Sequence, residues 1–153
     1  GHKDCIKKSN KIEIRYLSHI HDANEYLKYI QLSDIYVHLS RADTYPNAIL
    51  EALSCGIPTV AYEVGGIPEQ IVPFNNSSNY FISNIKPTGA LVPKFDSKQM
   101  AIIIEKLVSN VKLRTQISKN AISYSKQNFN FEVFAKSYLS WYSEILKSNQ
   151  VLN

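Results

Sequence analysis

Two carboxylates, Asp43 and Glu51, stand eight positions apart between two short apolar runs, Ile35–Leu39 and Thr59–Tyr62. This pattern predicts a strand, a turn, a helix and a second strand, with Glu51 within the helix. Free N–H groups and the positive dipole end at a helix start can hold a phosphate, and a nearby carboxylate can accept hydrogen bonds from sugar hydroxyls. A nucleotide sugar would supply both partners. The alternative is that the two acids only offset the helix dipole and stay solvated.

The helix that carries Glu51 has sequence signals at both ends. Thr44 is the expected N-cap, because its hydroxyl can accept a hydrogen bond from a first-turn N–H. Pro46 fits the first turn, where its missing N–H costs nothing, and Gly56 suits the position just past the helix end. The sequence therefore predicts a short helix with clear boundaries.

Strands alternate with helices along the rest of the chain. Ile12–Leu17 predicts the first strand and Gly89–Val92 the last, while residues 97–145 carry apolar residues at helical spacing. Residues 1–11 are expected to be a polar lead-in, and 73–86, rich in Asn and Ser, a surface excursion. The alternation predicts an α/β fold, namely a three-layer, Rossmann-like domain with a mainly parallel sheet and a helical C-terminus.

The composition is that of a globular protein of one domain. The 153 residues are 44% hydrophobic and 20% charged, with no apolar run near the roughly 20 residues of a membrane helix. Two cysteines, Cys5 and Cys55, make no disulfide framework, which indicates a reducing, cytoplasmic setting. A net charge of +4 suits an anionic ligand or the anionic inner face of a membrane. The basic residues are scattered and not interleaved with aromatics, so no nucleic-acid partner is expected.

Ligands of a parallel sheet bind beyond the carboxyl ends of its strands. Three loops are expected at that edge, Ser18–Asp22, Ser40–Pro46 and Glu63–Pro68. The third loop is rich in glycine. It lacks the strand–Gly-x-Gly-x-x-Gly–helix context of a dinucleotide site, so the sequence does not predict NAD binding.

A longer pattern combines the middle loop, its helix and the glycine-rich loop. The order and spacing resemble the C-terminal, donor-binding domain of retaining glycosyltransferases with the GT-B fold (glycosyltransferase group 1, family four), with 12–149 as the nucleotide-sugar-binding domain. The residues that carry the resemblance are Ser40, Asp43, Pro46, Asn47, Glu51, Ala52, Gly56, Pro58, Gly65, Gly66, Pro68 and Glu69.

The resemblance implies roles for both acids, which are the candidate catalytic residues. Asp43 would bind hydroxyls of the donor sugar, and Glu51 would hold the nucleotide ribose. Backbone N–H groups of the turn would face the diphosphate or the sugar, and the first loop would contact the base through its backbone. The candidate donor-binding residues are Ser18, His19, Ile20, Ser40, Thr44, Tyr45, Pro46, Asn47, Gly65 and Gly66.

The chain departs from the family pattern at three positions of these loops. Asp43 stands where most members have Glu, so the sugar contact is expected to be repositioned by one methylene. Thr44 and Ser18 each replace a frequent Gly. The GT-B fold also needs a second Rossmann-like domain, with the acceptor site and, before the first strand seen here, the basic residues that neutralise the diphosphate. We therefore expect this chain to be one half of a GT-B fold and inactive alone.

No metal or other cofactor is expected. His19 and His21 lack a third ligand at suitable spacing, and the family is generally independent of metals. His38, inside an apolar strand, is expected to be a satisfied core histidine. The aromatic series of the last helix is expected to pack in the core and against the other domain, with Trp141 at the edge of that stripe.

The resemblance implies transfer of a sugar from a UDP- or GDP-linked donor, with retention at the anomeric carbon. The acceptor would be a glycan or lipid-linked molecule, bound through the N-terminal domain, in bacterial surface polysaccharide synthesis. The enzyme would be cytoplasmic or peripheral at the inner membrane face. The alternatives are a stand-alone nucleotide-binding module without catalysis and an epimerase of the same fold.

Overall fold

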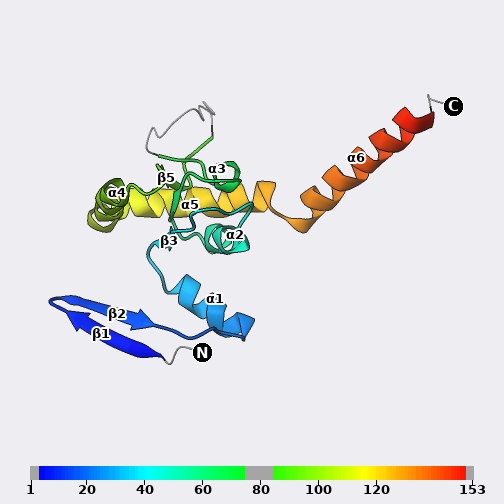
Figure 1. Cartoon of the computed structure of the whole chain (residues 1–153). Coiled ribbons are helices and arrows are strands. Elements are labelled where there is room, and N and C mark those ends of the chain that lie inside the picture. The colour runs from blue at the N-terminus through cyan, green and yellow to red at the C-terminus, as the bar shows by residue number, and fades with distance from the viewer. Residues whose placement is uncertain (1–3, 75–84, 151–153) are drawn as a thin grey trace.

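The computed structural model describes residues 4–74 and 85–150. A body of sheet and helices lies at the centre, and the β1–β2 hairpin and helix α6 extend away from it (Figure 1). Most of the predicted surface excursion lies outside the described residues. The elements are β1 Cys5–Ser9, β2 Ile12–Tyr16, α1 Ala23–Gln31, β3 Tyr36–His38, α2 Asn47–Ser54, β4 Thr59–Tyr62, α3 Ile67–Gln70, β5 Gly89–Val92, α4 Ser97–Ser109, α5 Val111–Asn128 and α6 Phe131–Gln150.

The central sheet has three parallel strands in the order β3-β4-β5. Val37 of β3 pairs with Val60 of β4, which pairs in turn with Ala90 of β5. Every residue of β4 and β5 is buried, as expected of parallel strands covered on both faces. The parallel sheet predicted from the sequence is confirmed.

Helices cover both faces of this sheet. On one face, Val60 and Val92 pack with Leu107 of α4 and Ile117 of α5. On the other face, Ala61 and Leu91 pack with the apolar side of α2, with α3 and with Ala121 of α5. Alternate residues of one strand thus face opposite layers, which is the period of two expected of a β-strand. The predicted three-layer α/β fold is confirmed.

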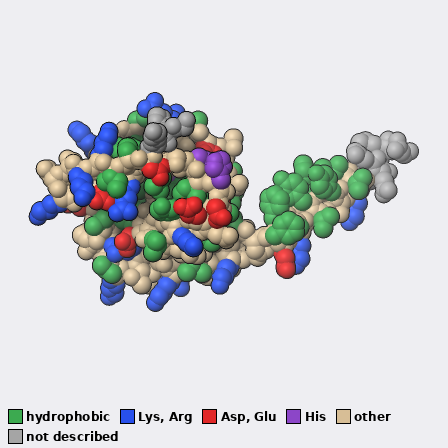
Figure 2. Space-filling view, turned by 90° about the horizontal axis from the view of Figure 1, so that it is seen from below, with side chains coloured by type: hydrophobic (Ala, Val, Ile, Leu, Met, Phe, Trp, Pro, Cys, Tyr) green, Lys and Arg blue, Asp and Glu red, His purple; other side chains and the backbone are tan. Residues whose placement is uncertain are grey.

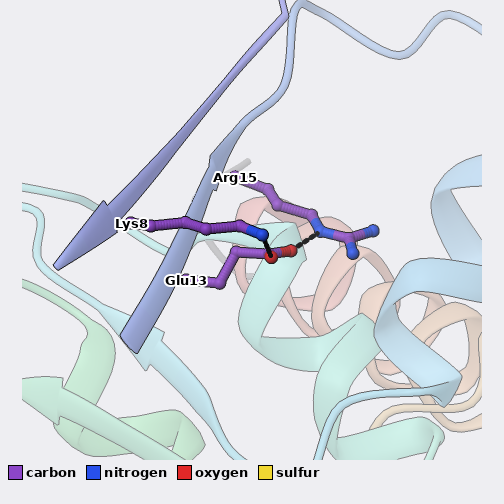
Figure 3. Close-up of polar contacts among 3 residues, drawn as sticks. All are labelled: Lys8, Glu13 and Arg15. Carbon is purple, nitrogen blue, oxygen red and sulfur yellow. Dashed lines mark hydrogen bonds and ion pairs between the residues drawn. The ribbon is translucent and has the colours of Figure 1, made fainter. Parts of the chain in front are cut away.

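The first strands differ from the prediction. Where the sequence predicts only a lead-in, Cys5–Ser9 forms β1, which pairs antiparallel with β2, Ile12–Tyr16, from Cys5↔Tyr16 to Ser9↔Ile12. This hairpin is separate from the central sheet. On one side of it, Glu13 lies between Lys8, at 3.6 Å, and Arg15, at 2.6 Å (Figure 3).

Helix α6 is exposed along nearly all of its described length. Hydrophobic side chains gather along one side of it (Figure 2). Phe131 is 83% exposed, and Leu139 and Leu146 are each 66% exposed. The amphipathic pattern predicted this helix and its apolar stripe, but the stripe is not in the core, and Trp141 is 55% exposed. Among the described residues, no helix is long and apolar enough to cross a bilayer.

Candidate functional site

Helix α2 begins two residues later than its sequence signals predict. The N-cap is Pro46, with φ −67° and ψ 123°, and no side chain caps the helix. Thr44, two residues before Pro46, is therefore not the cap. The reason is that proline disfavours helical backbone in the residue before it, so the helix cannot begin at Tyr45. The prediction for Gly56 is confirmed: it follows the C-cap residue Cys55 with φ +74°. No side chain among the described residues accepts a hydrogen bond from the first N–H groups of α2.

The turn before α2 touches the glycine-rich loop after β4. The Gly66 amide donates to the carbonyl of Asp43 at 3.3 Å. A Cβ on Gly65 would overlap the Asp43 carbonyl oxygen, and one on Gly66 would overlap that of Thr44. Gly65 also has φ +54°, in the region that favours glycine. The pair of glycines is thus required for the two backbones to meet.

A cavity of about 900 Å³ opens between these two loops. It lies at the carboxyl ends of the parallel strands, where ligands of such sheets bind. Its wall is formed by the turn after β3, the loop after β4, and Lys94, which follows β5. The lining residues are Arg41, Ala42, Asp43, Thr44, Val64, Gly65, Gly66, Glu69 and Lys94.

Asp43 has a neighbour that the sequence did not indicate. The Nε2 of His38 lies 3.5 Å from Oδ2 of Asp43, and the phenol oxygen of Tyr36 lies 3.2 Å from Nδ1 of His38. His38 is largely buried, but its Nε2 makes no hydrogen bond to a described residue, so the prediction of a satisfied core histidine is wrong. Only the contact between Tyr36 and His38 could have been predicted from the sequence, since residues two apart on a strand share a face.

Burial raises the pKa of Tyr36 to about 12, and the charges of Tyr26, Glu51 and Asp43 add to this shift. A tyrosine whose folded pKa exceeds its unfolded value of about 10 stabilises the fold below pH 10. That contribution is lost as the pH rises from about 10 through about 12. We expect Tyr36→Phe to reduce this alkaline loss of stability, measured by urea unfolding at pH 9 and above. An identical fall in the wild type and the variant would contradict the assignment.

Glu51 does not line the cavity that contains Asp43. It is exposed on α2 and forms a hydrogen bond with the hydroxyl of Tyr26, which lies on α1. The pKa of Tyr26 is raised first by burial and then by the charge and hydrogen bond of Glu51. The charge of Glu51 also raises the pKa of Cys55, after burial. The two candidate catalytic acids therefore lie on the same segment but face different surroundings.

The loop Ser18–Ile20 lies apart from the cavity. It borders a second hollow of about 360 Å³, which shares no lining residue with the first. The Ser18 amide donates to Oδ1 of Asp4 at 2.6 Å. Hydrogen bonds from the Ser18 side chain and then from this amide lower the pKa of Asp4. The expectation that all three loops share one edge is wrong in this structure, because β2 pairs with β1 and not with the central sheet.

The rings of His19 and His21 meet edge to face, with centroids 4.5 Å apart. No group of three histidine, cysteine or acidic side chains suited to a metal ion occurs in the part of the chain that the structure describes. His19 and His21 thus form a ring contact, and their predicted part in base binding stays a prediction.

The other predicted donor residues surround the start of α2. Pro46 is buried, and its carbonyl accepts from Nε2 of Gln70 at 3.1 Å, which ties α3 to the start of α2. Asn47 is the exposed first residue of the helix, and Ser40 is half-buried after β3. Tyr45 is 42% exposed, and burial followed by the charge of Glu69 raises its pKa. Each lies beside the cavity loops without lining the cavity.

A family model and two known protein sequences match most of this chain. The family model for glycosyl transferases group 1 matches residues 3–124. Over 121 residues, the chain is 25% identical to N-acetyl-alpha-D-glucosaminyl L-malate synthase of Bacillus anthracis, covering 79% of this chain and 29% of that protein. Over 118 residues, it is 27% identical to an uncharacterized glycosyltransferase of Methanocaldococcus jannaschii, covering 76% and 27%. The chain thus spans less than a third of the length of these relatives.

Solved structures share the fold. Sucrose-phosphate synthase of Thermosynechococcus elongatus aligns with a TM-score of 0.66 and 25% identity, covering 81% of this chain and 28% of that one. The C-terminal domain of a glycosyl transferase group 1 family protein of Francisella tularensis aligns at 0.62 and 26%, covering 75% and 53%. Anabaena HepE, solved in complex with UDP, aligns at 0.62 and 22%, covering 76% and 29%, and a second HepE structure contains UDP-glucose.

The family model covers well over half of the 153 residues, and the parallel sheet, its two helical layers and the loops at its carboxyl edge agree with that match. The resemblance found in the sequence is therefore confirmed. The chain belongs to the glycosyl transferase group 1 family and has the architecture of a GT-B domain.

Proposed function

We propose that this chain is the donor-binding half of a retaining glycosyltransferase. The donor is a UDP- or GDP-linked sugar, and the acceptor is a glycan or lipid-linked molecule held by an N-terminal domain. Surface polysaccharide synthesis, at the inner face of a membrane, is the setting that the family resemblance and the net charge of +4 support. One observation carries the proposal, namely the cavity between the Asp43 turn and the Gly65–Gly66 loop.

The cavity has suitable chemistry for the sugar end of such a donor. Asp43 and Glu69 line it with carboxylates that can accept hydrogen bonds from hydroxyls. The start of α2 lies beside it with uncapped N–H groups and the positive end of its dipole. Such a helix end stabilises a diphosphate, most strongly when negative charge builds up on it as the sugar leaves.

In this proposal, Glu51 binds the ribose of the donor nucleotide. Because Glu51 lies outside the cavity and beside Tyr26, a donor that reaches both acids extends along α2 from the cavity toward α1. Anabaena HepE, which shares this fold, was solved with both UDP and UDP-glucose, and this agrees with a donor of that size. The donor requires no metal in this proposal.

Isothermal titration calorimetry with UDP, GDP, ADP and their glucose conjugates tests the proposal. We expect one nucleotide to bind, with the same affinity in the presence of EDTA. Binding to the chain without sugar transfer by the complete protein would support the alternative of a nucleotide-binding module. Failure of all six compounds to bind even the complete protein would reject the glycosyltransferase proposal.

Glu51→Ala is expected to lower the affinity for the nucleotide about tenfold or more. The reason is that hydrogen bonds to a charged group contribute about 1.5–3 kcal/mol each. Glu105→Ala, which removes an exposed glutamate of α4, is the matched control and should leave the affinity unchanged. Equal affinities of the Glu51→Ala variant and the wild type would remove the ribose assignment.

A further inference from the structure

Two positively charged side chains, Arg41 and Lys94, line the cavity, and the family resemblance assigns a role to neither. Arg41 lies in the turn after β3, and Lys94 lies two residues after the end of β5. These strands are the two edges of the three-stranded sheet, yet both residues line the same cavity as Asp43. The carboxyl edge of the sheet therefore brings two positive charges from distant parts of the chain to one site.

A single aromatic ring lies beside both cations. The guanidinium carbon of Arg41 is 5.4 Å from the centroid of the Phe95 ring, and Nζ of Lys94 is 5.1 Å from it. Both distances are within the range of a cation–π contact. Both cationic side chains that line the cavity thus contact the same residue, Phe95.

Phe95 has an unfavourable backbone conformation and an exposed side chain. It is 59% exposed, and its φ of +68° is rare and strained for a bulky residue. The turn around it is fixed: the Asp96 amide donates to the Pro93 carbonyl at 3.0 Å, and the Asp96 side chain accepts from Gln99 at the start of α4. Strained residues of this kind cluster at binding sites.

The two positive charges are not neutralised by described carboxylates. None of the ion pairs between described residues includes Arg41 or Lys94, although Asp43 and Glu69 line the same cavity. Two like charges that line one cavity repel each other, and an anion bound between them offsets that repulsion. Carboxylate and phosphate groups are the anions that guanidinium and ammonium bind best, through charge-assisted hydrogen bonds.

We propose that Arg41 and Lys94 form an anion subsite, and that the sugar bound in the cavity carries a carboxylate or a phosphate. This inference rests on the proposed function, since it adds a substrate class to the same cavity. The negative group belongs either to an acidic donor sugar or to a phosphorylated acceptor. It is distinct from the diphosphate of the donor.

NMR titration of the chain with glucose, glucuronate and glucose 6-phosphate tests the subsite without a nucleotide. We expect at least one of the charged sugars to shift the amides of Arg41 and Lys94, with an affinity at least about tenfold above that of glucose. Higher salt should weaken this binding. The double variant Arg41→Gln/Lys94→Gln should abolish the preference, and Lys112→Gln, an exposed cation of α5, should retain it. Equal binding of the three sugars, or equal effects of the two variants, would overturn the proposal.

Calorimetry with UDP, UDP-glucose and UDP-glucuronate, or the matching conjugates of whichever nucleotide binds, separates the sources of the charge. A preference for the glucuronate conjugate assigns the charge to the donor. Binding of glucose 6-phosphate on top of saturating UDP-glucose assigns it to the acceptor. If the double variant weakens UDP itself as much as the charged sugars, the cations serve the diphosphate and the inference is overturned. Nucleotide binding without any anion preference rejects the subsite alone, and anion binding without nucleotide binding rejects the donor proposal alone.

Discussion

Gly66→Ala is expected to lower both the affinity for the donor and the stability of the fold. The added methyl group would overlap the carbonyl oxygen of Thr44, so the glycine-rich loop must move away from the Asp43 turn. The hydrogen bond from Gly66 to Asp43 is then lost. Because overpacking of this kind costs about 1–3 kcal/mol, we expect a clear fall in the urea midpoint. Since the two cavity walls separate, the affinity for the donor nucleotide sugar should fall by about tenfold or more.

Gly89→Ala is the matched control for this variant. Its methyl group would overlap the carbonyl oxygen of Thr59 in the neighbouring strand, away from the cavity. It should destabilise the fold comparably and leave the affinity of the folded molecules close to that of the wild type. Measurement by calorimetry well below the unfolding midpoint separates the two effects. Loss of affinity to the same extent in both variants would show that stability alone explains it.

Leu53→Ala is expected to cost about 2–5 kcal/mol of unfolding free energy. Leu53 is fully buried on α2 and packs in the cluster that contains Ala61 of β4 and Leu91 of β5. Its truncation removes apolar contacts and leaves a cavity that the surrounding layers cannot fill completely. Urea unfolding should show a lower midpoint with an unchanged slope.

Leu32→Ala provides the comparison. Leu32 is the same residue type but is 84% exposed at the end of α1, so its truncation should change the free energy by no more than about 0.5 kcal/mol. If the two leucine variants had the same urea midpoint, this would contradict the packing of Leu53 on α2 against the sheet. Since α2 carries the turn with Asp43, that result would also remove the basis for the cavity.

The buried strands were predictable residue for residue. Thr59–Tyr62 and Gly89–Val92 have the predicted bounds, because each is a short apolar run with a proline directly at one end. The pairing partner of a strand could not be predicted in the same way. The alternation in Ile12–Tyr16 predicts a strand but not which strand it pairs with, and in the structure it pairs with β1.

Parts of the candidate site were likewise predictable from the sequence, and other parts were not. The meeting of the Asp43 turn with Gly65 and Gly66 followed from the topology of a parallel sheet. The loop Ser18–Ile20 was misplaced because its position depends on the pairing of β2. The positive φ of Phe95 has no sequence signal, since such a backbone is expected of glycine or asparagine and not of phenylalanine.

The exposed stripe on α6 has a consequence for the behaviour of the protein in solution. A run of large apolar side chains on one side of a helix lowers solubility unless something covers it. Phe131, Leu139 and Leu146 expose apolar surface on this helix, and none of the residues that line the cavity lies on α6. Exchange of exposed leucines on α6 for lysine would therefore improve handling for the binding measurements without altering the donor site.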